Sequence, residues 1–225
     1  MRAMSLETST QILDAVEHLP SGATLVIHEF SWDDYERLLN DLGDRPGLRI
    51  SYDSGRLEVM SPTSRHEKCE VLIGDLVLIF CEVFHLTLEK AGGTTWRRRS
   101  LAKGAEADGS FYIRNAKHTI GKEDIDLEQD PPPDIAVEVD VTRNSAGKFR
   151  IYAGLGIPEV WRYHRKVCKL YALTNGKYKE IAVSGFLPRL TGEMISDAIE
   201  MGRSKGQDEA RRAFRRRIKG LKKKQ

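Results

Sequence analysis

Acidic side chains alternate with apolar ones along one stretch of the sequence. In DIAVEVDV (134–141), Asp134, Glu138 and Asp140 share one face of a predicted strand, because successive side chains of a strand point to opposite faces. Another carboxylate, Asp108, lies in a second predicted strand, EADGSFYI (106–113). If the two strands are neighbours, Asp108, Glu138 and Asp140 converge. Carboxylates that close repel one another unless a cation or a proton joins them. Mg²⁺, with Mn²⁺ as a substitute, is the hard cation that this chemistry favours.

Lys148 is placed to act with these carboxylates. It lies near the start of the helix that we expect after strand 134–141, and its side chain could reach back over that strand. An ammonium there could orient an attacking water or stabilise charge that develops on a phosphate. Two simpler interpretations stay open. The carboxylates could be the solvated face of an ordinary sheet, and Lys148 could be an ordinary surface lysine.

The surrounding sequence alternates strands and helices. The expected elements are, in order, helix 9–19, strand 24–30, helix 32–42, hairpin 48–60, helix 64–84, strands 94–101, 106–113 and 134–141, helix 145–155, strand 159–164, hairpin 167–184 and helix 191–203. Ser64 and Ser145 are the predicted N-caps of their helices, and Glu67 could close a capping box with Ser64. Asn175-Gly176 is a strong hairpin signal. The strand–helix–strand unit over 134–164 predicts parallel pairing in a buried sheet, and hence an α/β fold.

The composition indicates the cellular compartment of the protein but says little about its function. The formal net charge of +3 is too small to indicate a partner. The three cysteines form no CxxC pair, which argues against a zinc site or a disulfide scaffold and favours a reducing cytoplasm. The N-terminal segment lacks the apolar core of a signal peptide, and we expect no membrane span. The segment EARRAFRRRIKGLKKKQ (209–225) is strongly basic, and we expect a loosely held helix that binds phosphates in a salt-sensitive way.

Four segments in this order resemble a bacterial family of restriction-endonuclease-like proteins, Uma-two, of the PD-(D/E)xK nuclease superfamily. They are SPTSRHE (61–67), GTTWRR (93–98), EADGSFYI (106–113) and PPPDIAVEVDVTRNSAGKFRIYAGLGIPEVWRYH (131–164). The resemblance implies a restriction-endonuclease-like α/β core, with a mixed central sheet flanked by helices. The N-terminal helix and hairpin and the basic C-terminal helix are additions to it. We accordingly divide the chain into 1–44, packed on the core, a nuclease-like domain over 45–203, and a basic tail over 204–225.

The resemblance also implies roles for individual residues. Asp108 and Glu138 correspond to metal-binding carboxylates. The superfamily places a lysine two residues after the glutamate, where this chain has Asp140, so Asp140 becomes a further metal ligand or a supporting group. Lys148 then fits the place from which some relatives supply the lysine. Asp134 lies at the start of its strand, and it is a weaker candidate for a metal ligand than Asp108 or Glu138.

His66 and Glu67 match the family pattern at the start of the long helix, where the superfamily often has a glutamate near the metal. We therefore count both as candidate catalytic residues, with the capping box as the alternative for Glu67.

The sequence is compatible with three functions. The first is a Mg²⁺-dependent endonuclease that cleaves DNA, with a homodimer as a possible assembly. The second, suggested by the displaced lysine, is a catalytically inactive nuclease fold that binds DNA or another partner. The third is a hydrolase that uses the same carboxylate–metal chemistry on a different substrate, since a fold does not fix a function.

Overall fold

The computed structural model describes residues 6–43, 47–140 and 147–223, and the predicted N-cap Ser145 lies outside these ranges. The helices are α1 (Leu6–Glu17), α2 (Trp32–Leu42), α3 (Ser64–Phe84), α4 (Lys148–Leu155), α5 (Gly192–Lys205) and α6 (Gln207–Lys222), with short 3-10 turns at Arg99–Leu101 and Ala116–His118. The strands are β1 (Thr24–Ile27), β2 (Arg49–Asp53), β3 (Arg56–Met60), β4 (Glu89–Lys90), β5 (Thr95–Arg98), β6 (Lys103–Glu106), β7 (Gly109–Tyr112), β8 (Ile135–Asp140), β9 (Glu159–His164), β10 (Val167–Thr174) and β11 (Lys177–Ile181). The expected α/β class is confirmed.

The strands form two sheets. The first is antiparallel, in the order β1-β3-β2-β6-β5. Its central hairpin turns at Ser54 and Gly55, which both have positive φ, as a type I′ hairpin turn requires. Helices α1 and α2 contribute to its core, in which Tyr35, Leu57 and Val59 are fully buried. The N-terminal segment and the 48–60 hairpin therefore share one sheet and one core.

The second sheet is mixed, in the order β11-β10-β9-β8-β7-β4. Strands β8 and β9 pair in parallel, with Glu138 opposite Arg162, so the predicted crossover over 134–164 is confirmed. The hairpin of β10 and β11 turns at Asn175 and Gly176, both with positive φ, as expected.

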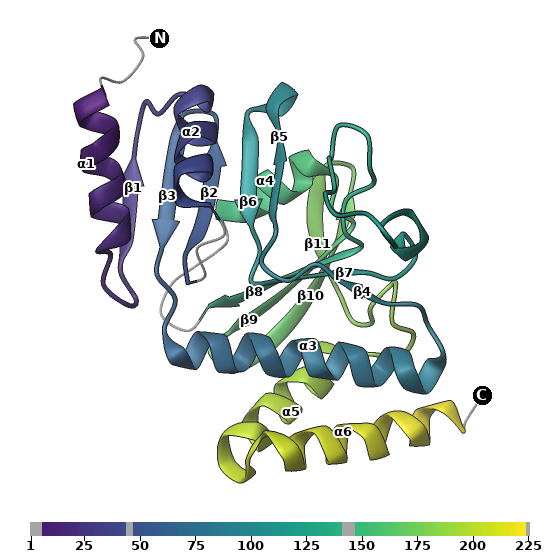
Figure 1. The fold of residues 1–225 in the computed structure, drawn as a ribbon. Coiled ribbons are helices and arrows are strands. Elements are labelled where there is room, and N and C mark those ends of the chain that lie inside the picture. Colours follow the sequence, from purple (N-terminus) through teal and green to yellow (C-terminus); the bar gives the residue numbers. More distant parts are fainter. Residues whose placement is uncertain (1–5, 44–46, 141–146, 224–225) are drawn as a thin grey trace.

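Helices cover the second sheet on both faces (Figure 1). Ile135, Val137 and Val139 of β8 share a core with α3, α5 and α6. Ala136, on the opposite face of β8, packs with α4 in a core that also includes residues of the first sheet. Helix α4 therefore lies between the two sheets, and both faces of β8 are buried.

Helix α6 is firmly docked, contrary to the expectation of a loosely held tail. Ala210, Phe214 and Ile218 are buried in the core shared with α3. Arg211 and Arg215 form 2.7 Å ion pairs with carboxylates of α3. The expectation failed because apolar residues four positions apart align on one helix face and need only a matching helix beside them. In the ranges that the structure describes, no helix is both long and apolar enough to cross a bilayer.

Candidate active site

Asp108 lies where the chain passes from one sheet to the other. Strand β6 ends at Glu106 in the first sheet, and β7 begins at Gly109 in the second. The single strand expected over 106–113 is therefore wrong. The backbone N–H of Asp108 already donates to the Val137 carbonyl at 3.0 Å, which fixes it beside β8. Its side chain is 1% exposed.

Both carboxylate oxygens of Asp108 have partners. Oδ1 accepts a hydrogen bond from Arg49 Nε at 3.1 Å, and Oδ2 accepts one from the Val139 N–H at 2.7 Å. Nε2 of His66 lies 3.0 Å from Oδ2. Burial raises the pKa of Asp108, but His66, Lys148 and the Val139 N–H together hold it below its usual value. Asp108 is therefore an ionised, oriented carboxylate at neutral pH.

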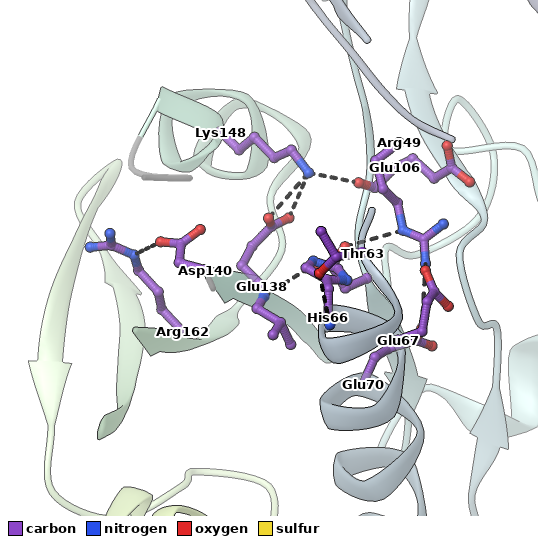
Figure 2. Close-up of polar contacts among 12 residues, drawn as sticks. Arg49, Thr63, His66, Glu67, Glu70, Glu106, Glu138, Asp140, Lys148 and Arg162 are labelled. Atoms are coloured by element: carbon purple, nitrogen blue, oxygen red, sulfur yellow. Dashed lines mark hydrogen bonds and ion pairs between the residues drawn. The ribbon is translucent and has the colours of Figure 1, made fainter. Parts of the chain in front are cut away.

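Glu138 and Lys148 form a buried ion pair. Lys148 Nζ lies 3.1 Å from each carboxylate oxygen of Glu138 and donates to the Glu106 carbonyl at 3.0 Å (Figure 2). Tyr152, one turn further along α4, donates its hydroxyl to Glu138 Oε1. Burial and the nearby Asp108 raise the pKa of Glu138, although Lys148 opposes them. The alternatives of a solvated sheet face and an ordinary surface lysine are wrong, because Glu138 is 2% exposed and the Lys148 side chain is 12% exposed.

A cavity of about 250 Å³ joins these groups. Asp108, Glu138 and Lys148 line it. Residues of the β2–β3 hairpin and of the segment 61–63 line it as well, so the first sheet contributes to the wall of the site. The structure thus brings together the carboxylates and the ammonium that the sequence suggested.

Asp140 and Asp134 have other partners. Asp140 also lines the cavity, but its Oδ2 is 2.5 Å from Arg162 Nε and 3.9 Å from His164 Nδ1, both on β9. Asp134 directly precedes β8 and lies about 13 Å from Glu138 along the chain, at about 3.3 Å per residue. It accepts hydrogen bonds from the backbone N–H groups of Ile113 and Asn115, so its role is structural. Within the ranges that the structure describes, no group of three or more His, Cys, Asp or Glu side chains is arranged to hold a metal ion.

The start of α3 differs from the prediction in its cap. Thr63, not Ser64, is the N-cap, and its side chain accepts from the His66 N–H. The predicted capping box between Ser64 and Glu67 is therefore wrong. His66 is 5% exposed and points toward Asp108. Glu67 is 3.3 Å from Arg49 and so reaches the site through that guanidinium.

Two residues of this network, Tyr152 and Arg49, were not predicted from the sequence. Tyr152 was detectable, since it lies four positions after Lys148 and therefore on the same face of α4. Arg49 gave a weaker signal, a charged residue next to Ile50 at the head of strand β2. Its contact with Asp108, 59 positions away, depends on how the two sheets meet.

Carboxylates outnumber permanent cations in the network that surrounds Arg49 and Lys148. Arg49 and Lys148 are the two permanent cations of a network with five carboxylates, namely Glu67, Glu70, Glu106, Asp108 and Glu138. Burial raises the pKa of Glu70 and of Glu106 to about 7. The arrangement therefore favours a further cation or a proton, because the buried carboxylates of the network gain from a positive neighbour.

Comparisons with known proteins identify the family and the fold of the chain. The family Uma2, described as "Putative restriction endonuclease", matches residues 32–202. A solved structure, "a putative nuclease belonging to DUF820" from Anabaena variabilis, is similar in fold, with a TM-score of 0.51 and 12% sequence identity. The similarity covers 74% of this chain and 97% of that one. No curated protein matches the chain. The match over residues 32–202 places this chain in the Uma2 family of restriction-endonuclease-like proteins.

Proposed function

We propose that the protein is a Mg²⁺-dependent endonuclease that hydrolyses phosphodiester bonds of DNA. One observation carries the proposal: two buried carboxylates, Asp108 and Glu138, and the ammonium of Lys148 line the same cavity. Two acids and a lysine beside a phosphate are the groups that metal-assisted phosphodiester hydrolysis uses. Membership of a family described as restriction endonucleases supports DNA as the substrate.

The donor chemistry fits Mg²⁺. This ion usually binds through one or two carboxylates and completes its shell with waters and substrate phosphates, so Asp108 and Glu138 suffice as protein ligands. Asp140, held by Arg162, would support the cation through its charge or a bridging water. When bound, Mg²⁺ would polarise the phosphate and lower the pKa of a bound water.

The chain's own groups would then act around the phosphate. The Lys148 ammonium, held by the Glu106 carbonyl and Glu138, would orient the attacking water and stabilise the charge that develops on the phosphate oxygens. His66 would keep Asp108 ionised and oriented. At the cavity rim, Arg150 is 78% exposed and could contact the DNA backbone without reading its sequence.

A specific observation favours a second candidate, a nuclease fold that binds DNA without cutting it. The carboxylate oxygens of Asp108 and Glu138 are already bonded to protein donors, and Asp140 stands where the superfamily pattern has a lysine. A metal would have to use the remaining lone pairs of these oxygens and compete with the Lys148 ammonium for Glu138. The homodimer and the cytoplasmic location stay predictions.

Plasmid cleavage separates the candidates. Supercoiled DNA is incubated with the parent chain and with Glu138→Ala, in Mg²⁺ or Mn²⁺ and in EDTA. The endonuclease proposal expects nicking by the parent with metal, and none by the variant or in EDTA. Salt-sensitive binding by both proteins without nicking would establish the second candidate. Equal nicking by Glu138→Ala would show that the cavity is not the active site.

A further inference from the structure

Arg49 takes no part in the proposed hydrolysis, yet its guanidinium contacts four groups of the site. It heads β2, and its side chain is 9% exposed. Nε donates to Asp108 Oδ1 at 3.1 Å and Nη1 to the Leu48 carbonyl at 3.0 Å. Nη2 lies 3.3 Å from both Glu67 Oε1 and Glu70 Oε2 of α3 (Figure 2). One side chain of the first sheet therefore ties Asp108 to α3.

We propose that Arg49 is a positioning residue that fixes the orientation of Asp108 for metal binding, and that the first sheet thereby sets the metal affinity of the site. This inference rests on the proposed function, since it takes Asp108 as a metal ligand. It assigns the N-terminal sheet a part in the chemistry, in addition to its part in the wall of the cavity.

The bonding of Asp108 supports this role. The Val139 N–H and His66 both approach Oδ2, whereas Arg49 is the donor to Oδ1. Without Arg49, the carboxylate keeps partners at one oxygen only and gains freedom to rotate. Glu67 and Glu70 would also lose the cation that separates their charge from that of Asp108, and the repulsion would push Asp108 from its place.

The connection needs an arginine. A planar guanidinium offers several donors in a rigid fork, whereas a lysine concentrates its charge on one nitrogen. Lysine at position 49 would preserve the charge but could not hold Asp108 and both glutamates together.

The test measures Mn²⁺ binding to the full chain by titration calorimetry, with Arg49→Ala, Arg49→Lys and the parent. We expect both variants to bind Mn²⁺ about 10- to 100-fold more weakly, the usual loss when a partner of a metal ligand is removed. The control is Arg212→Ala, which removes an arginine that is 63% exposed and paired with Glu209 on α6. It should leave the affinity unchanged.

Guanidinium ion provides a second readout. A second cavity, of about 1160 Å³, is lined by Arg49, Glu67 and Glu70, so the free ion can reach the vacated position. Millimolar guanidinium, but not equal NaCl, should restore part of the affinity of Arg49→Ala. A purely structural role would not respond in this way.

The outcomes are distinguishable. Folded variants that bind Mn²⁺ like the parent overturn the inference and leave the endonuclease proposal intact. If Arg49→Ala does not fold, Arg49→Lys, which keeps the charge and most of the volume, decides the matter alone. If the parent protein binds Mn²⁺ but does not cleave DNA, the endonuclease proposal is wrong and the inference about Arg49 stands. A parent that binds no Mn²⁺ overturns both.

Discussion

Replacing Lys148 by methionine tests how much the buried ion pair between Lys148 and Glu138 contributes to the free energy of unfolding. The change keeps the length of the side chain but leaves Glu138, which is 2% exposed, without its ammonium. Removing one partner of a buried ion pair typically costs about 3–5 kcal/mol. The Tyr152 hydroxyl still donates to Glu138, so we expect the lower end of that range, about 3 kcal/mol at pH 8.

The loss of unfolding free energy in Lys148→Met should increase with pH. The pKa of Glu138 in the folded chain lies above its ordinary value of 4.5, because burial outweighs the attraction of Lys148. Without Lys148 it rises further. The folded variant then holds the proton more tightly than the unfolded chain, so the free energy of unfolding is highest below pH 4.5 and falls as the pH rises through the folded pKa. The difference from the parent should therefore grow between pH 5 and pH 8.

Urea unfolding at pH 5 and pH 8, followed by circular dichroism, measures these differences. Adding Glu138→Gln to Lys148→Met should recover about 1–3 kcal/mol at pH 8, since the double variant buries no unpaired charge. The matched control is Lys169→Met, whose lysine is 50% exposed and paired with Glu180, and which should cost less than about 1 kcal/mol. A cost for Lys148→Met no larger than that of the control, or one that does not change with pH, would refute the reasoning.

Three further variants probe the same network. Glu106→Gln should raise the free energy of unfolding at pH 8 by up to about 3 kcal/mol and flatten its fall above pH 4.5, because burial raises the Glu106 pKa to about 7; an unchanged pH profile in urea unfolding would contradict this. Tyr152→Phe removes a donor to Glu138 and should lower stability by about 1–3 kcal/mol, seen as a lower melting temperature. Asp134→Ala leaves two backbone N–H groups without their acceptor and should cost about 2 kcal/mol or more. Its Mn²⁺ affinity by calorimetry should stay that of the parent, and a large loss would make Asp134 a metal ligand.

Local patterns in the sequence predicted much of this fold. The hairpins at Ser54–Gly55 and Asn175–Gly176, the long helix α3 and the crossover from β8 to β9 follow from turn chemistry and periodicity. Lys148 was placed near Glu138 because the start of a helix after a strand lies close to that strand's end.

The errors arose where distant parts of the chain meet. The residues 106–113 have a continuous strand pattern, and nothing local shows that Glu106 pairs in one sheet and Gly109 in the other. The cap at Thr63 in place of Ser64 is a shift of one position, which sequence rarely resolves between adjacent hydroxyl residues. Arg49 was missed because its partners come from α3 and from the junction of the sheets.

The carboxylates at and next to β8 show what their spacing could predict. It indicated that a site exists, but not which of the three acids belongs to it. Asp134, Glu138 and Asp140 share one face and are all buried, so each must have a partner. Asp134 accepts hydrogen bonds from backbone amides, Asp140 pairs with Arg162 of β9, and Glu138 pairs with Lys148 of α4. Alternation ensures that the three carboxylates face the same way, but the neighbouring elements decide what each one does. Of the three, Glu138 faces both the cavity and the ammonium, and it is therefore the residue whose loss should abolish cleavage.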